Sequence, residues 1–286
     1  MVTPFDKKGA VDYARARKLA LALLSSGSDG LVVSGTTGES PTLTHKEKLR
    51  LFSEVKAAVG TRGSVIAGTG SYCTEESIKL TREAEQAGAD ACLLVVPYYN
   101  KPTQEGLFAH FNAIAAATRL PCVLYNVPSR TITNLAPETV IKLAKIDNIF
   151  ALKEASGNLE QASKIIQGTP SSFLVYSGND SDTLPLMALG AYGVVSVVSH
   201  LVGRQLKNMM ESFASGDTRG AAAEHRRLLP LVNAMFLVSN PIPVKYALNR
   251  AGFAAGKPRL PLTEPDEQTA ARIDAALKAY KIDLPV

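Results

Sequence analysis

Seven short apolar runs, rich in β-branched residues, recur along the chain at nearly even spacing, and this recurrence constrains the fold more than any other feature of the sequence. Runs of this length and composition are typical of strands that are buried on both faces. The first run begins at residue 31 and the last at residue 194, so the six intervals average about 27 residues, the length of one strand and one helix with short connections. The runs cover residues 31–33, 65–67, 93–96, 123–125, 149–152, 173–176 and 194–198.

Helix-period segments separate the runs, and several begin with a capping residue, as at Thr44, Thr74 and Asp180. The alternation predicts an α/β fold with a parallel sheet. Crossovers of nearly constant length favour a closed (β/α)8 TIM barrel over an open doubly wound sheet. A doubly wound sheet usually carries a dinucleotide fingerprint after its first strand, whereas residues 68–73 supply only two of its three glycines.

The two ends of the chain depart from this repeat. Only three residues precede Pro4, and a barrel strand needs about five, so we expect strand 1 to be truncated. Beyond residue 217 the strand signal stops, and three helical segments are predicted at residues 218–236, 241–251 and 264–280. We therefore predict a catalytic (β/α)8 barrel over residues 1–216 and a C-terminal three-helix domain over residues 217–286.

Charge and composition exclude several classes of protein. The 31 basic and 26 acidic residues leave a formal net charge of +5, which is too dilute to indicate a nucleic-acid surface. No apolar run reaches the roughly 18 residues that a membrane-spanning helix needs, and the first residues lack the pattern of a signal peptide. Cys73, Cys92 and Cys122 form no C-x-x-C pair, so neither a disulfide framework nor a zinc site is expected. We expect a protein of the reducing cytoplasm that binds neither nucleic acid nor a membrane.

The active site of such a barrel lies at the carboxyl ends of its strands, which directs attention to Lys153. This lysine directly follows the apolar run at residues 149–152, so its side chain would project into or over the barrel interior. Loss of solvent there favours the neutral amine, which is the nucleophile of imine-forming enzymes. The alternative is a structural lysine paired with Glu154 or another carboxylate, and position alone weighs the two equally.

Two other strand ends carry groups suited to a small acid. Thr36 and Thr37 lie between glycines in residues 35–40, where hydroxyls and backbone N–H groups can hold a carboxylate. The alternative is a plain turn with no binding role, which is more common for such a sequence. Tyr125 ends another strand, and its neutral phenol can both donate and accept a proton. Ordinary buried packing is the alternative for this tyrosine.

A second group of candidates follows the strands more loosely. Tyr98 and Tyr99 follow one strand. Like Tyr125, each can transfer a proton or can simply pack as a buried side chain. Arg130 lies in a turn after Pro128, where its guanidinium can clamp a carboxylate or simply face solvent.

Neither metal catalysis nor a serine nucleophile has support in the sequence. No histidine spacing suits a metal, and only His200 falls at a predicted strand end. No serine lies in a G-x-S-x-G turn. The four histidines are His45, His110, His200 and His225.

Four motifs at separate strand ends, taken in order, closely resemble the dihydrodipicolinate synthase family, also called the 4-hydroxy-tetrahydrodipicolinate synthase family. The resemblance covers essentially the whole chain, and it favours the imine-forming interpretation of Lys153 over the structural one. The motifs are G-T-T-G-E-S at residues 35–40, P-Y-Y-N at 97–100, Y-N-V-P-S-R-T at 125–131 and K-E-A-S-G-N at 153–158.

The resemblance implies a Schiff-base aldolase-type carbon–oxygen lyase that condenses pyruvate with L-aspartate 4-semialdehyde in lysine and diaminopimelate biosynthesis. Lys153 would form the Schiff base. Tyr125, Thr36 and Tyr99 would make the proton relay, with Tyr99 supplied by a neighbouring subunit. The family is commonly a homotetramer built as a dimer of dimers, and it implies no metal or organic cofactor.

The resemblance also assigns residues that bind the substrates. Thr37 and the backbone at Val195 would hold the pyruvate carboxylate. Arg130 would receive the carboxylate of the semialdehyde, with the Gly178 carbonyl nearby.

An alternative activity exists within the same superfamily. N-acetylneuraminate lyase and 2-keto-3-deoxy sugar acid aldolases resemble this chain in the lysine, the tyrosine and the G-x-x-G-E loop. Arg130 and the paired Tyr98 and Tyr99 favour the synthase, because the sugar lyases lack both features.

Some members of the family are inhibited by lysine at the subunit interface. Lys48 replaces a position that is commonly neutral or histidine, and Tyr72 replaces one that is commonly asparagine. A cation beside the ammonium of the ligand is unfavourable, so we expect lysine inhibition to be weak or absent. The positions that match the effector site are Ser40, Pro41, His45, Lys48, Tyr72, Glu76 and Tyr98.

Overall fold

A computed structural model describes residues 1–285 of the chain. The fold divides into two compact units. The terminal unit comprises Met1–Val65 together with Ser196–Val286, and the central unit comprises Ile66–Val195.

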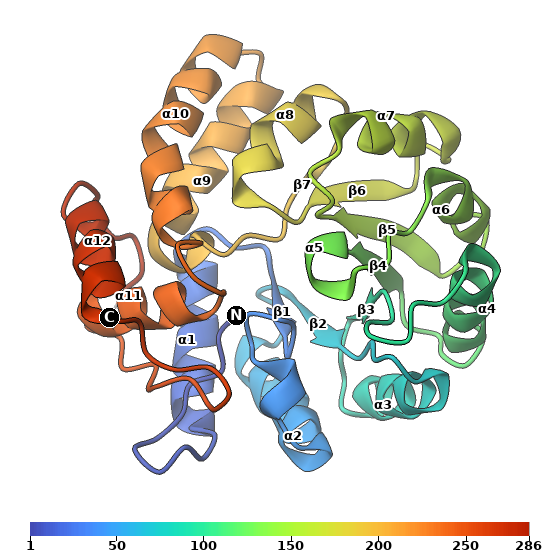
Figure 1. Cartoon of the computed structure of the whole chain (residues 1–286), viewed down its shortest axis with the longest axis horizontal. Helices are drawn as coiled ribbons and strands as arrows, with labels where there is room; N and C mark the ends of the chain where they lie inside the picture. The colour runs from blue at the N-terminus through green and yellow to red at the C-terminus, as the bar shows by residue number, and fades with distance from the viewer. Residues whose placement is uncertain (286) are drawn as a thin grey trace. The chain divides into compact units, whose positions relative to one another are not determined.

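The strands form one sheet whose order, β1-β2-β3-β4-β5-β6-β7, follows the chain, and the pairs from β2 to β7 are parallel (Figure 1). This order confirms the predicted α/β fold with a parallel sheet. The strands are β1 Gly30–Val33, β2 Ser64–Gly68, β3 Ala91–Val95, β4 Cys122–Asn126, β5 Ile149–Glu154, β6 Leu174–Ser177 and β7 Gly193–Val194.

Helices alternate with these strands, and in the central unit they lie outside the strands (Figure 1). The longer helices are α1 Tyr13–Ser25, α2 His45–Val59, α3 Thr74–Gln86, α4 Gln104–Ala115, α7 Leu159–Gly168, α9 Ser199–Ala214, α10 Thr218–Ala234, α11 Ile242–Arg250 and α12 Glu267–Leu277. The short ones are η1 Ser40–Thr42, α5 Pro128–Thr131, α6 Pro137–Leu143, η2 Asp180–Asp182 and α8 Thr183–Ala188.

The central strands are buried on both faces, as their continuous apolar runs predict. Every residue of β4 is buried, and four of the five residues of β3 are buried. The last apolar run is the exception, because only Gly193 and Val194 form a strand. Val197 and Val198 are buried at the start of α9 instead, where their carbonyls accept from His200 and Leu201 N–H groups. Val197 and Val198 are therefore apolar because they are buried, although they do not pair in the sheet.

Among the described residues no strand precedes α1, where the sequence predicts a truncated strand 1. The first residues instead lie beside β1 and the turn that follows it. The Met1 amino group donates to the Val32 carbonyl at 2.6 Å, and the Thr3 hydroxyl donates to the Gly38 carbonyl at 2.7 Å. A single bridge joins Phe5 and Val11.

The three residues predicted to cap helices occupy different positions at the helix starts. Thr44 caps α2 in a full capping box with Glu47, as its sequence pattern predicts. Thr74 is the first residue of α3, where the cap is Cys73. Asp180 begins the 3-10 turn η2, and α8 follows directly.

The three C-terminal helices α10, α11 and α12 confirm the predicted segments. Within the terminal unit, α10 packs against α9 and α12, and α11 packs against α9 and α12 (Figure 1). The division into compact units groups these helices with the first 65 residues, so a domain boundary at residue 216 stays a prediction. None of the helices described here is both long and apolar enough to cross a bilayer.

Candidate active site

Lys153 and Tyr125 lie side by side on neighbouring strands of the central unit. The parallel register pairs Tyr125 of β4 with Lys153 of β5, and Lys153 with Tyr176 of β6. Residues paired in this way point to the same face of the sheet. The Lys153 Nζ lies 4.1 Å from the centroid of the Tyr125 ring, within the range of a cation–π contact.

The opposite face of the same strands holds a buried polar network around Glu154. Its carboxylate accepts from Asn126 Nδ2 at 3.2 Å, from Gln161 Nε2 at 3.2 Å and from the Ser156 N–H at 2.6 Å. The side chain of Glu154 therefore points away from Lys153. Across residues 1–285, the side chain of Lys153 has neither a hydrogen bond nor an ion pair, and the Glu154 carboxylate is bound by other groups, so Glu154 is not the partner of Lys153.

The backbone after β6 and β7 completes this part of the site. A Cβ placed on Gly178 would lie 2.7 Å from Ala155 Cβ and 3.1 Å from Lys153 Cε, so a side chain at this position would crowd both residues. The Val195 N–H already donates to the Ser177 carbonyl at 2.8 Å. A substrate carboxylate can therefore bind the Val195 backbone only by sharing this N–H with the Ser177 carbonyl, because the Val195 carbonyl is itself an acceptor.

Tyr99 adopts an uncommon conformation at the end of β3. Its φ is +75°, in the left-handed region that aromatic residues rarely adopt, and its side chain is 93% exposed. The neighbouring Tyr98 packs edge to face on Tyr72, with ring centroids 5.2 Å apart. Asn100 fixes the same loop, because its Nδ2 donates to the Tyr72 carbonyl at 2.9 Å.

Arg130 lies on the one-turn helix α5, which begins directly after β4. Its side chain is exposed, and its backbone N–H donates to the Val127 carbonyl at 2.9 Å. The turn therefore places Arg130 beyond the strand end that holds Tyr125.

Thr36 and Thr37 belong to the terminal unit, in the turn of residues 35–40 that follows β1. Backbone bonds close the turn, from Gly38 N–H to the Gly35 carbonyl and from Glu39 N–H to the Thr36 carbonyl, both at 3.0 Å. The Thr37 hydroxyl accepts a hydrogen bond from Asn240 Nδ2 at 2.9 Å. Both threonines are half-buried.

A buried ion pair supports this turn, and the sequence analysis missed it. Lys245 Nζ lies 2.7 Å from Glu39 Oε1, and both side chains are almost completely buried. Lys245 Nζ also lies 4.0 Å from the centroid of the Phe5 ring. Burial lowers the pKa of Lys245, and the charge of Glu39 opposes that shift. A lysine flanked by apolar residues in α11, after Pro241 and Pro243, was the available signal for this contact.

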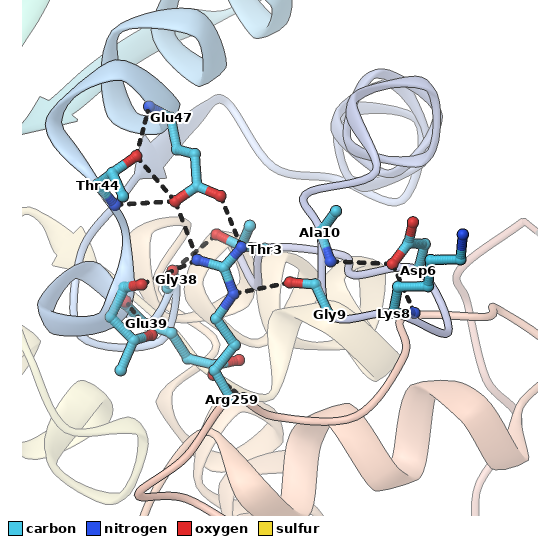
Figure 2. Close-up of polar contacts among 11 residues, drawn as sticks. Thr3, Asp6, Lys8, Gly9, Ala10, Gly38, Glu39, Thr44, Glu47 and Arg259 are labelled. Carbon is cyan, nitrogen blue, oxygen red and sulfur yellow. Dashed lines mark hydrogen bonds and ion pairs between the residues drawn. The ribbon is translucent and has the colours of Figure 1, made fainter.

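Arg259 extends the same network to α2, as Figure 2 shows. Its backbone N–H donates to Glu39 Oε2 at 2.8 Å, and its guanidinium binds both carboxylate oxygens of Glu47, at 2.6 and 2.9 Å. A third guanidinium bond reaches the Gly9 carbonyl at 2.8 Å. The hydrogen bond with Arg259 is the main reason that the pKa of Glu47 is lowered to about 2.

The histidines lie in structural positions. His200 Nε2 accepts from the Val2 N–H at 3.0 Å and Nδ1 lies 2.8 Å from the Val197 carbonyl, so the ring is a neutral tautomer, and burial lowers its pKa to about 3. His110 is buried on α4, which lowers its pKa to about 4. His45 and His225 lie on α2 and α10, as predicted. Residues 1–285 contain no group of three histidine, cysteine or acidic side chains that is placed to hold a metal.

Comparison with known proteins agrees with this arrangement. The model of the dihydrodipicolinate synthetase family matches residues 1–280. A 4-hydroxy-tetrahydrodipicolinate synthase of Dehalococcoides mccartyi is 64% identical over 286 residues, which cover 100% of this chain and 96% of the relative.

Two solved structures share the fold. The enzyme of this family from Cyanidioschyzon merolae, determined with lysine bound, has a TM-score of 0.96 at 49% identity, over 98% of this chain and 95% of the other. The chloride-inhibited dihydrodipicolinate synthase of Acinetobacter baumannii, complexed with pyruvate, has a TM-score of 0.95 at 40% identity, over 98% and 96%. These likenesses confirm the predicted (β/α)8 barrel. The chain belongs to the dihydrodipicolinate synthetase family.

Proposed function

We propose that Lys153 forms an imine with pyruvate and that the enamine derived from it attacks L-aspartate 4-semialdehyde. The activity is that of a 4-hydroxy-tetrahydrodipicolinate synthase, a Schiff-base lyase of lysine and diaminopimelate biosynthesis, because the family match and a 64% identical relative span the chain. The observation that carries the role of Lys153 is its position beside Tyr125, 4.1 Å from the ring, with no carboxylate partner in residues 1–285.

The chemistry needs a neutral amine and a group that moves protons. The Lys153 nitrogen attacks C2 of pyruvate, and the carbinolamine loses its oxygen as water to give a protonated imine. The imine withdraws electrons from the adjacent methyl group, which releases a proton and leaves an enamine. The enamine carbon then forms a bond to the aldehyde carbon of the semialdehyde, and the amino group of that substrate displaces Lys153 as the ring closes. Tyr125 carries these protons in this proposal, because a phenol both donates and accepts and its ring lies 4.1 Å from the Lys153 nitrogen.

The remaining roles follow from the family. Thr36 and Tyr99 join Tyr125 in the proton relay. Thr37 holds the pyruvate carboxylate, with the backbone of Val195, and Arg130 receives the carboxylate of the semialdehyde near the Gly178 carbonyl.

The exposure of Tyr99 supports an assembly of several subunits. A tyrosine that is 93% exposed and held at a positive φ gains nothing from its own chain, which suits a side chain that completes a neighbouring site. We propose a homotetramer formed as a dimer of dimers. We also propose a cytoplasmic location, where three free cysteines stay reduced.

Borohydride trapping tests the imine. Reduction in the presence of pyruvate alone should attach one pyruvate per chain, at Lys153 and at no other lysine. Lys153→Arg should abolish the adduct, and the matched surface variant Lys145→Arg should retain it. An adduct that maps to another lysine would rule out the mechanism.

The role of Arg130 is tested by steady-state kinetics with both substrates. Arg130→Ala should raise the KM for the semialdehyde by about 10-fold or more and leave the KM for pyruvate nearly unchanged, because a charge-assisted hydrogen bond contributes about 1.5–3 kcal/mol. Arg119→Ala, an exposed arginine elsewhere in the central unit, is the control. Faster release of pyruvate from keto-deoxy sugar acids than condensation with the semialdehyde would favour the sugar acid aldolase instead.

Feedback by lysine is expected to be weak or absent, because Lys48 adds a cation at a position that is commonly neutral or histidine in the family. Tyr72, the second unusual residue, is half-exposed and packs on Tyr98, while Glu76 accepts from the Ser71 hydroxyl at 3.1 Å. The measurement is initial rate against lysine concentration. An inhibition constant below one millimolar would contradict this expectation, and Lys48→Ala should strengthen any inhibition that is seen.

A further inference from the structure

Two side chains from one short segment of the terminal unit contact the turn that carries Thr37. Asn240 lies two residues before α11, is buried, and donates from Nδ2 to the Thr37 hydroxyl oxygen at 2.9 Å. Lys245, one turn into α11, binds the carboxylate of Glu39 in the same turn at 2.7 Å. Residues about 200 positions apart in the sequence are thereby fixed against each other at two points.

The hydrogen bond from Asn240 restricts the direction in which the proton of the Thr37 hydroxyl can point. A hydroxyl carries one proton and two acceptor sites, and an amide nitrogen can only donate. Because Asn240 Nδ2 occupies an acceptor site of the Thr37 oxygen, the proton of this hydroxyl has to point elsewhere. A hydroxyl whose proton is directed outward is prepared to donate to a carboxylate.

The turn itself needs support from outside, because its backbone is strained. Glu39 has φ +57° and Ser34 has φ +59°, and neither is a glycine. Such conformations persist when surrounding contacts hold them. Here Thr3 binds the Gly38 carbonyl at 2.7 Å, and Lys245 and the Arg259 N–H hold the two oxygens of Glu39. The position of Thr37 therefore depends on residues of the C-terminal segment.

We propose that Asn240 is a positioning residue for the pyruvate carboxylate, acting through the Thr37 hydroxyl, in a turn that the Glu39–Lys245 pair holds in place. The inference rests on the proposed role of Thr37 and adds what directs its proton. Asn240 acts on the substrate only through Thr37, so the effect of its removal must disappear when the Thr37 hydroxyl is absent.

A double-mutant cycle with pyruvate alone tests this dependence. The full-length variants are Asn240→Leu, Thr37→Val and their combination, and the readout is the pyruvate concentration that gives half-maximal borohydride trapping. Thr37→Val should raise this concentration by about 10-fold or more, since it removes a hydrogen bond to a charged group. Asn240→Leu should raise it by about 3- to 10-fold, the usual range for one neutral hydrogen bond. The combined variant should match Thr37→Val alone.

A matched control separates positioning from general loss of stability. Asn249 lies on α11, the helix that follows Asn240. It binds the Gly256 carbonyl at 3.1 Å and the Ala255 N–H at 2.7 Å, so Asn249→Leu should lower the melting temperature without changing pyruvate trapping. If Asn240→Leu does not fold, Asn240→Ala takes its place in the cycle.

The outcomes of the cycle test two claims separately: that Asn240 positions the Thr37 hydroxyl, and that Thr37 binds the pyruvate carboxylate. An equal rise from Asn240→Leu in the presence and absence of the Thr37 hydroxyl would overturn the positioning role, and so would no rise at all. If Thr37→Val leaves trapping unchanged, the role of Thr37 in binding the carboxylate is wrong. Trapping at Lys153 in the parent chain would still stand in that case, so the two failures are distinguishable.

Discussion

At the scale of single residues, Gly178 lies where a side chain would crowd Ala155 and Lys153. The Gly178 N–H donates to the Glu154 carbonyl at 2.7 Å, which holds this backbone close to β5. A Cβ would lie 3.1 Å from Lys153 Cε and 2.7 Å from Ala155 Cβ, closer than ordinary contacts. One of these groups must move when a side chain is added.

We therefore predict that Gly178→Ala lowers the rate of imine formation while the chain still folds. A displacement of about 1 Å at a reacting group can cost about 100-fold in rate, so a fall of about 10- to 100-fold is expected. The measurement is the single-turnover rate of borohydride-trappable adduct. Gly106→Ala is the control, because a Cβ there meets nothing closer than 3.4 Å in α4. Unchanged trapping in Gly178→Ala would show that Lys153 tolerates the added methyl group.

At the scale of elements, α11 and the turn after β1 are joined by a buried pair of opposite charges. Lys245 and Glu39 have side chains that are 1% and 0% exposed, so neither can be solvated if its partner is lost. The pair also receives the Arg259 N–H and the Phe5 ring. Its contribution lies mainly in avoiding an isolated buried charge, because the desolvation cost of such a pair offsets much of its attraction.

Lys245→Met should lower the free energy of unfolding by about 3–5 kcal/mol, since it leaves the Glu39 carboxylate buried without a counter-charge. Adding Glu39→Gln to Lys245→Met should recover part of that loss, because the glutamine is neutral and its carbonyl still accepts from the Arg259 N–H. Urea unfolding of the parent, the two single variants and the double variant measures the coupling. A double variant less stable than Lys245→Met would contradict this account.

At the scale of the whole molecule, acid stability depends on groups that folding prevents from taking up a proton. Burial lowers the pKa of His110 to about 4 and that of His200 to about 3, whereas an unfolded histidine titrates near 6.5. The unfolded chain therefore binds more protons below pH 6.5. The stabilisation is complete above that pH and is lost as the pH falls.

From about pH 6 to about pH 5, the free energy of unfolding should fall by up to about 2.7 kcal/mol per pH unit if both histidines titrate only in the unfolded chain. Glu47 adds a second loss below about pH 4.5, because Arg259 holds the folded pKa of Glu47 near 2 and its contribution disappears as the pH falls toward that value. Urea unfolding across this range measures both parts. His110→Leu should halve the slope above pH 5, and a free energy that is flat over the same range would contradict the prediction.

The sequence predicted much of the fold and named the residues that are proposed for the site, and the reason differs from element to element. Strands such as β4 were recognisable because burial on both faces leaves a continuous apolar run. β7 was overestimated, because Val197 and Val198 are buried without pairing as strand. Lys153 and Tyr125 could be proposed as neighbouring candidates because the active-site groups of a barrel follow its strands directly, and the sheet register places the two residues side by side.

By itself the sequence determined the α/β repeat, the parallel sheet and the candidate side chains at the strand ends, because polarity with the period of a strand or helix is a local property of the chain. Only the tertiary structure showed that Glu154 is not the partner of Lys153, because its carboxylate binds Asn126 and Gln161 on the opposite face of the sheet. It also decided what holds Thr37, since Asn240 lies 203 positions away in the sequence. Contacts over such distances depend on how the elements pack, and packing leaves no periodic signal along the chain.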